Sequence, residues 1–205
     1  MAWVITFLIA ILLIAGASKI FRSSERRDYC ETPAIASVPE FRFTTQDGKE
    51  LTREDLLGKV WVIDFFFSRC PGPCPMMNSK LAEISKELKK AKEVRLVSLS
   101  IDPEYDTPAV LKEYAGKFGA DPDRWIFLTG PKEKVEAFTT KGMLQALSTD
   151  SSTPANTVHS TRFLVIDREG RIRMIRKLDE PELVQKLLID IGNLLREPYT
   201  KPKAP

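Results

Sequence analysis

Cysteine and histidine are scarce in this sequence of 205 residues, which has three cysteines and one histidine. So few of them exclude a disulfide-stabilised scaffold and an array of zinc fingers. The charges nearly balance, since the sequence has 31 basic and 28 acidic residues and a net charge of only +3. Binding to duplex nucleic acid needs a concentrated basic face, so we expect no nucleic acid partner. Any thiol or imidazole chemistry must use Cys30, Cys70, Cys74 and His159.

The rest of the composition is that of a globular chain with one domain and short additions. Hydrophobic residues make up 43% and charged residues 29%, with 10 glycines and 14 prolines, which excludes a wholly disordered or collagen-like chain. We expect an N-terminal apolar segment over residues 1–21, a polar linker over 22–38, a folded domain over 39–196 and a disordered tail over 197–205.

The N-terminal segment predicts a membrane anchor. Its first 18 residues carry no charged side chain, and about 20 such residues cross a bilayer as a helix. The alternative is a signal peptide that is cleaved after Ala15-Gly16-Ala17. Basic residues follow the segment, which favours a cytoplasmic position for the part of the chain after it. Large domains nevertheless cross the membrane regardless of such charges. The residues alone leave the orientation open. Cys30, in the linker, is interpreted as an incidental thiol.

The soluble part alternates strands and helices. A hairpin is predicted over residues 41–52 with Asp47-Gly48 as its turn, and the apolar run 59–67 predicts a buried central strand. Further strands are expected over residues 94–101, 125–128, 162–166 and 171–175. Helices are expected to begin at Cys74, at Pro108 after an N-capping Thr107, at Pro131 with an end near Gly142, and at Pro181. This order predicts an α/β fold with a mixed, mostly parallel central sheet flanked by helices.

Cys70 and Cys74 lie in the segment Cys70-Pro71-Gly72-Pro73-Cys74-Pro75, between the central strand and the start of a helix. The positive end of a helix stabilises thiolates. Two sulfurs at this spacing can close a disulfide or hold one metal ion, and two thiolates with an imidazole suit copper, particularly Cu(I). The spacing alone does not choose between a metal site, a redox-active pair and a structural disulfide. Met76 and Met77 are interpreted as core residues.

His159 is the only imidazole that could complete such a metal site. It precedes a predicted strand whereas Cys70 follows one, so the two meet only if these strands are antiparallel, which the terminal hairpin permits. Asp64 interrupts the apolar run of the central strand. If it is buried, its pKa is raised and it could exchange a proton with Cys74. Alternatively, Asp64 faces a wet cleft or pairs with a lysine.

Three motifs together resemble the SCO/SenC family over roughly residues 41–191. The family pattern C-P-x-x-C-P is present at residues 70–75. Residues 98–103 (SLSIDP), followed by Asp106-Thr107-Pro108, resemble a second family stretch. His159-Ser160, before the strand that contains residues 163–167, resembles the third. Asp102 and Asp106 themselves are expected to cap and end elements locally.

The resemblance implies a thioredoxin-like fold and copper ligation by Cys70, Cys74 and His159. It further implies a metallochaperone that is anchored in the membrane by its N-terminal helix and faces the periplasm or an equivalent space. The expected partners are the copper-accepting subunit of a cytochrome oxidase and a thiol–disulfide reductant. The alternative is a thiol–disulfide oxidoreductase in which Cys70 attacks, Cys74 resolves and Asp64, which resembles the buried aspartate of thioredoxin, relays a proton. An interaction module with a structural disulfide is a third possibility.

Overall fold

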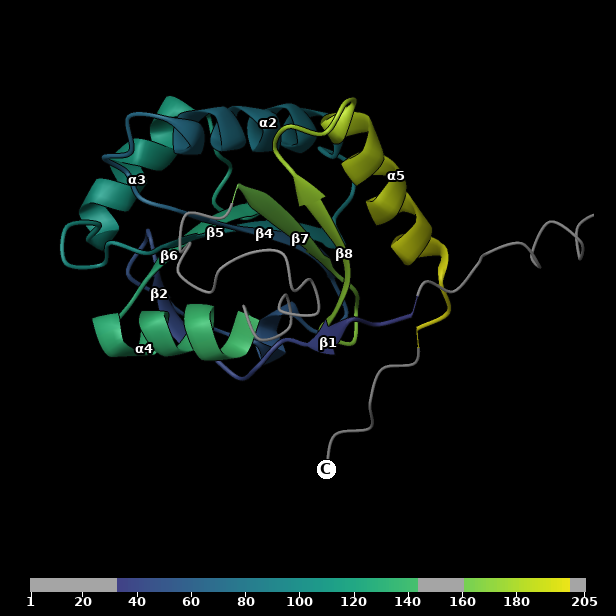
Figure 1. Cartoon of the computed structure of the whole chain (residues 1–205), viewed down its shortest axis with the longest axis horizontal. Coiled ribbons are helices and arrows are strands. Elements are labelled where there is room, and N and C mark those ends of the chain that lie inside the picture. The colour runs from purple at the N-terminus through teal and green to yellow at the C-terminus, as the bar shows by residue number, and fades with distance from the viewer. Residues whose placement is uncertain (1–32, 144–160, 200–205) are drawn as a thin grey trace, which may run out of the picture. The chain divides into compact units, whose positions relative to one another are not determined.

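The computed structural model describes residues 33–143 and 161–199, in which one mixed sheet lies between two layers of helix (Figure 1). The strands are β1 (Ala36–Ser37), β2 (Arg42–Thr45), β3 (Glu50–Thr52), β4 (Val60–Phe66), β5 (Val94–Ser100), β6 (Trp125–Thr129), β7 (Arg162–Ile166) and β8 (Arg171–Lys177). The helices are η1 (Glu54–Leu56), α2 (Pro73–Glu87), α3 (Pro108–Lys117), α4 (Lys132–Glu136), η2 (Ala137–Met143) and α5 (Leu183–Arg196). The expected α/β fold with a mixed central sheet flanked by helices is therefore confirmed. The expectation that the sheet is mostly parallel is wrong, because among the described strands only β4–β5 and β5–β6 pair in parallel and the other five pairs are antiparallel.

The strand order in the sheet is β1-β8-β7-β4-β5-β6-β2-β3. Strands β4, β5 and β6 are parallel, whereas β7 is antiparallel to β4. The predicted hairpin over residues 41–52 forms β2 and β3, with Gly48 in the left-handed conformation at the turn. Because β7 runs against β4, the residue that begins β7 lies at the same end of the sheet as the residue that ends β4.

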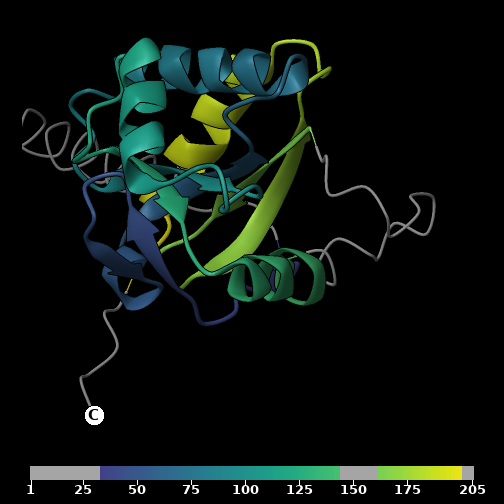
Figure 2. The same cartoon turned by 90° about the vertical axis from the view of Figure 1, so that its left-hand side faces the viewer.

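The central strand β4 is buried along its whole length, as its apolar run predicts. Val62 and Phe66 pack in the core beneath α2, α3 and α5, while Ile63 and Phe65 pack on the opposite face with α4 and η2. Figure 2 shows these helices on the two sides of the sheet. Successive side chains of a strand point to opposite faces of the sheet. The side chain of Asp64 therefore lies on the α2 face, opposite to those of Ile63 and Phe65.

Two helices begin close to where the sequence predicts. Pro73 opens α2 one residue before the expected Cys74, and Thr107 caps α3 by accepting a hydrogen bond from the Val110 backbone N–H at 3.4 Å. Helix α5 begins at Leu183 rather than at Pro181. Glu182 between them has a φ of 56°, in the left-handed region, and a helix cannot continue through that conformation.

The helical segment that follows Pro131 reaches Met143, close to the predicted end near Gly142, but it is not α-helical throughout. After α4 the chain widens into the π-helical η2, which continues to the buried Met143. The hydroxyl of Thr139 donates to the Val135 carbonyl at 2.8 Å, and the hydroxyl of Thr140 donates to the Glu136 carbonyl at 2.5 Å. These hydroxyls compete for carbonyls that would otherwise accept the normal helical hydrogen bonds, which gives a physical reason for the wider turns.

The folded domain extends past both expected boundaries. Ala36 in the predicted linker pairs with Ile172 of β8. Glu197, in the predicted tail, accepts hydrogen bonds from the Arg173 guanidinium at 2.7 and 2.9 Å. Within residues 33–143 and 161–199, no helix has the length and apolarity needed to cross a bilayer. The predicted anchor over residues 1–21 and the thiol of Cys30 lie outside the described residues.

Candidate functional site

Cys70 and Cys74 meet at the junction between β4 and α2. Cys70 closes a turn after β4, in which its N–H donates to the Phe67 carbonyl at 3.1 Å, and Cys74 lies in the first turn of α2. Both are free thiols that are only 8% and 5% exposed, and their side chains are hydrogen-bonded to each other. The prediction that the two sulfurs converge on one point is therefore confirmed.

The surroundings give the two thiols different acidities. Burial opposes ionisation of Cys70, but hydrogen bonds from the backbone and thiol of Cys74 and from the Gly72 backbone outweigh it and lower the pKa of Cys70. Burial raises the pKa of Cys74 to about 12, with further contributions from its hydrogen bond to Cys70 and from the charges of Cys70 and Asp64. Cys70 is thus the more acidic thiol of the pair, and Cys74 is the less acidic one.

Asp64 is fully buried, and its charge contributes to the raised pKa of Cys74. Its Oδ1 accepts a hydrogen bond from the Ser98 hydroxyl at 2.6 Å, and Ser98 in turn accepts one from the Trp125 indole N–H at 2.9 Å. Burial raises the pKa of Asp64 to about 7, against a smaller opposing effect of Ser98. No lysine among the described residues pairs with Asp64, and no solvent reaches it, so the alternative of a wet cleft or a lysine pair is wrong.

Asp106 joins the segment that precedes Cys70 to the end of β5. Its carboxylate accepts hydrogen bonds from the Ser68 N–H at 3.0 Å, from the Ser68 hydroxyl and from the Ser100 hydroxyl. The Ile101 N–H also donates to the Phe66 carbonyl at 2.8 Å. The expectation that Asp106 acts only locally is wrong, because it contacts a loop 38 residues earlier in the chain.

The rim of the site is formed by charged and aromatic side chains. Arg69 donates to Asp102 at 2.5 Å, and its guanidinium lies 4.1 Å from the centroid of the Tyr105 ring. Met77 is a core residue, as expected, but Met76 is 61% exposed and is not. The i, i+3 helical spacing from Cys74 identifies Met77 as inward-facing, whereas Met76 lies on the outer face of α2.

Two buried polar residues beneath α2 were not predicted from the sequence. Asn78, one turn after Cys74, is fully buried, and its amide Nδ2 donates to the Tyr114 hydroxyl at 3.0 Å. The spacing along α2 could have identified Asn78 as inward-facing. It comes four residues after the buried Cys74, and residues at i and i+4 lie on the same face of a helix.

His159 lies outside the described residues, so its distance from the sulfurs stays a prediction. The topological condition for their meeting is met, because β7 pairs antiparallel with β4, with Ile63 opposite Leu164. The chain enters β7 at Arg162, three residues after His159, at the end of the sheet that holds the cysteines. In the parts of the chain that the structure describes, no three His, Cys, Asp or Glu side chains are grouped closely enough to hold a metal ion.

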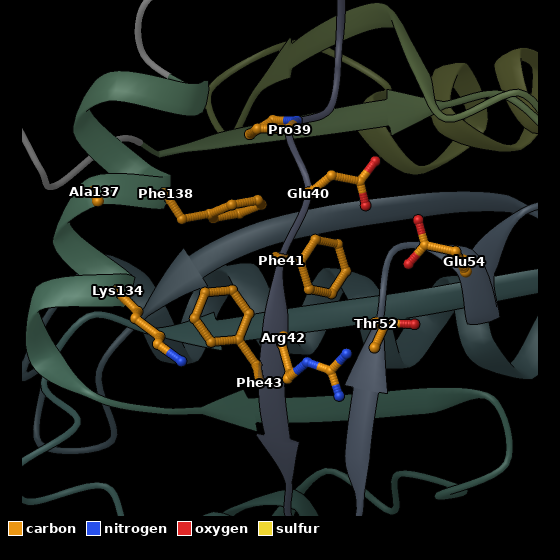
Figure 3. Close-up of a pocket in the computed structure, with 10 residues that line it drawn as sticks. All are labelled: Pro39, Glu40, Phe41, Arg42, Phe43, Thr52, Glu54, Lys134, Ala137 and Phe138. Carbon is orange, nitrogen blue, oxygen red and sulfur yellow. The ribbon is translucent and has the colours of Figure 1, made fainter.

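A pocket of about 610 Å³ lies on the other face of the sheet (Figure 3). Phe41, Phe43 and Phe138 form its apolar floor, with Glu40 and Lys134 among the polar side chains around it. These three aromatic side chains belong to the core on the α4 side, whereas Cys70 and Cys74 belong to the core on the α2 side. The sheet therefore separates this pocket from the dithiol.

The chain is similar to known proteins both in sequence and in fold. The SCO1/SenC family model matches residues 31–195. The SCO1 protein homolog of Bacillus subtilis (strain 168) is 32% identical over 162 residues, which span 78% of this chain and 83% of that protein.

Two solved structures extend this similarity to the fold. BsSco, described as a member of the Sco family of cytochrome c oxidase assembly proteins with a disulfide switch, has a TM-score of 0.65 and 28% identity, over 81% of this chain and 96% of its own. Yeast Sco1 with copper bound has a TM-score of 0.61 and 28% identity, over 78% of this chain and 94% of its own. This likeness confirms the thioredoxin-like arrangement that the sequence motifs imply.

Proposed function

The chain belongs to the SCO1/SenC family, and on this premise we propose that it binds copper and delivers it to the copper centre of a respiratory cytochrome oxidase. The observation that carries the proposal is the contact between two buried, reduced thiols at the start of α2. Thiolates are soft ligands that select Cu(I), and a solved relative is a copper-bound protein.

The ligands in this proposal are Cys70, Cys74 and His159. The hydrogen bond between the two cysteine side chains supports this set, and so does the position of Arg162, where β7 begins, because β7 is antiparallel to β4 and Arg162 lies at the end of the sheet where β4 ends. Asp106 fixes the segment before Cys70, so the sulfurs are held in place before the metal arrives. Copper is the cargo, and it leaves by exchange of these ligands for those of the accepting subunit.

An anaerobic Cu(I) titration in the presence of a competing chelator tests this function. The reduced protein should bind one equivalent, and Cys70→Ser or Cys74→Ser should weaken binding by at least about 100-fold, since even an outer residue of a metal site contributes 10–100-fold. His159→Ala should also weaken binding, whereas Cys30→Ser should not. Wild-type affinity in both Cys74→Ser and His159→Ala would refute the proposal.

A thiol–disulfide activity is the second candidate, and the separation of the two thiol acidities favours it. Cys70, with its lowered pKa, is the attacking thiolate, and Cys74 is the resolving thiol. Asp64, buried beneath Cys74 with a pKa of about 7, is suited to take the proton of that thiol near neutral pH. Oxidation of the pair would also control copper loading, because a disulfide offers no thiolate.

The two functions are separated by Asp64→Asn. We expect this variant to exchange disulfides more slowly than wild type while it binds Cu(I) with the same affinity. The control is Cys30→Ser, which leaves both properties unchanged. An exchange rate equal to wild type in Asp64→Asn would remove Asp64 from the redox step without affecting the copper proposal.

The proposed location is a membrane-anchored domain that faces the periplasm or an equivalent extracytoplasmic space. The uncharged run over residues 1–18 supports the anchor, and the proposed partner, an oxidase copper centre, supports the orientation. A protease-protection assay on intact spheroplasts tests it. Cleavage of the domain only after the inner membrane is broken would contradict this orientation.

A further inference from the structure

The pocket of about 610 Å³ beside α4 lies on the face of the sheet opposite to the dithiol, so the proposed copper and thiol chemistry does not use it. Its floor consists of the rings of Phe41, Phe43 and Phe138, which contact one another with centroid distances of 5.3 to 5.5 Å. An apolar floor of this size with a few charged side chains around it is the usual form of a binding site.

One wall of the pocket is an open edge of extended chain. Residues 39–43 run along the pocket, with β3 on their other side (Figure 3). Strand β3 pairs with β2 from Arg42 to Thr44, but β6 pairs with β2 only at Thr44 and Thr45. Among the described strands, none therefore lies beside Arg42 on the side that faces α4. The backbone groups of such an edge are available to an added strand.

The hydrogen-bonding phase of β2 identifies which backbone groups face the pocket. The Gln46 N–H donates to the Phe127 carbonyl of β6 at 2.9 Å. Because N–H and C=O groups alternate in direction along a strand, those of Arg42 and Glu40 point to the same side as those of Gln46. The backbone of Glu40 makes no hydrogen bond to the backbone of another described residue. An extended peptide in the pocket therefore meets unpaired main-chain donors and acceptors.

One end of the pocket is negatively charged. Figure 3 shows the carboxyl groups of Glu40 and Glu54 turned toward each other, and a hydrogen bond between their side chains raises the pKa of Glu40 and lowers that of Glu54. Arg53 forms an ion pair with Glu40 at 3.0 Å, whereas Glu54 forms no ion pair with the described residues. Two carboxyl groups with one arginine favour an added cation.

The two basic side chains that line the pocket do not cancel this charge. Arg42 is paired with Glu50. Lys134 lies on the other side of the aromatic rings from Glu54 (Figure 3). The acidic end is thus free to receive a basic group of a ligand.

We propose that this pocket is a docking groove for an extended peptide segment of a partner protein, which adds as a strand beside residues 39–43. An apolar side chain of the segment enters the space over the three aromatic rings, and a lysine or arginine two positions away contacts Glu40 and Glu54. Side chains two positions apart lie on the same face of a strand, roughly 7 Å from each other. In this mode of recognition the main chain supplies affinity and the alternate side chains supply specificity.

The partner is a separate protein rather than residues 200–205 of this chain. Those residues include two lysines, which have the right charge, but they include no large apolar side chain. Two of them are prolines, which have no N–H to donate to a neighbouring strand.

Terminally blocked synthetic peptides of about six residues are the probes. They consist of threonine, which favours strands, with one leucine and one lysine separated by one residue, in either order. Calorimetry measures their binding to the full chain in lipid nanodiscs, where no detergent competes for the apolar floor. At least one order should bind with a dissociation constant below about 1 mM. Absence of saturable binding by both orders refutes the proposal.

Two variants locate the binding site. Ala137→Trp, at an exposed position of the pocket wall, fills the groove and should weaken binding at least about tenfold. Glu54→Lys should weaken binding of the lysine peptide about fivefold and strengthen binding of a matched glutamate peptide by a similar factor. The control Glu113→Lys, an exposed substitution on α3, should change neither. Unchanged binding in Ala137→Trp, or no reversal of preference in Glu54→Lys, contradicts the assigned groove.

Methylation of alternate backbone nitrogens of the peptide tests whether it adds as a strand. Successive N–H groups of a strand point to opposite sides, so methylation of one set should abolish binding and methylation of the other should change it by less than about twofold. Equal effects of the two sets would exclude strand addition.

Two further measurements identify the other possible occupants. Deletion of residues 200–205 should leave the peptide affinity unchanged, and a gain of about tenfold or more would make that segment the occupant. A dimer of the full chain that dissociates in Ala137→Trp would assign the groove to a second copy. Either result overturns the proposal, and none of these readouts depends on copper binding or on thiol chemistry.

Discussion

The buried acid Asp64 gives the stability of this protein a pH dependence that can be calculated. Its carboxyl has no exposed surface, and burial raises its pKa from 3.8 to about 7 in the folded state. The folded protein therefore binds this proton more tightly than the unfolded chain does. The resulting stabilisation is complete below pH 3.8 and is lost as the pH rises through about 7.

The size of the effect follows from the two pKa values. Between them the unfolded chain has released the proton and the folded protein has not, so stability falls by about 1.4 kcal/mol per pH unit. From pH 5 to pH 8 the free energy of unfolding falls by about 2.5 kcal/mol in total. The fall per pH unit becomes smaller above pH 7, because the carboxyl of the folded protein then ionises as well. Asp64→Asn removes this titration and retains a group that can hydrogen-bond to Ser98.

Urea unfolding of wild type and Asp64→Asn at several pH values between 5 and 8 provides the test. The difference in unfolding free energy, wild type minus variant, should decrease by about 2.5 kcal/mol over this range. Taking the difference cancels the titration of other groups that both proteins share. A difference that is constant with pH, or that rises, would show that Asp64 is already ionised in the folded protein and would refute the reasoning.

Three further predictions concern the dithiol and the buried ion pairs. In the reduced protein at pH 7, iodoacetamide should label Cys70 well before Cys74, because only Cys70 has a lowered pKa. Tandem mass spectrometry of the peptide that holds both cysteines measures the order of labelling. Asp106→Ala should lower the free energy of unfolding by about 1–3 kcal/mol, because it leaves buried donors unpaired. The same variant should bind Cu(I) more weakly in a competition titration. Unchanged affinity would contradict the role of Asp106 in positioning the segment before Cys70. Arg173→Met should lower the free energy of unfolding in urea by about 1–3 kcal/mol, because it removes the buried donor that Asp167 and Glu197 share, although Asp167 keeps its ion pair with Arg171. Arg42→Met, in an exposed pair, should cost at most about 1 kcal/mol.

The fold could largely be predicted because its signals are local. The continuous apolar run of β4, the Asp47-Gly48 turn and the Thr107-Pro108 helix start each specify their element within a few residues. The errors occur where the outcome depends on distant contacts. Neither the left-handed Glu182 nor the pairing of Glu197 with Arg173 has a signature in the neighbouring sequence.

The site was predicted as a set of residue types but not as an arrangement. The spacing of Cys70 and Cys74 requires that they be close, and the polarity of Asp64 within an apolar strand marks it as unusual. By contrast, the link from Asp106 to Ser68 spans 38 positions and depends on β4 and β5 being parallel neighbours. Such a contact follows from the strand order, which local patterns do not encode.

The same buried acid connects the two proposed activities. Cu(I) binds thiolates, so loading the site must remove the proton that Cys74 holds with a pKa of about 12. Disulfide formation must remove the same proton before Cys74 can attack Cys70. Asp64 lies near this sulfur, takes up a proton at a pKa of about 7, and has no other charged partner among the residues described. A site that alternates between copper loading and dithiol oxidation therefore requires only one proton acceptor, and the core beneath α2 contains one.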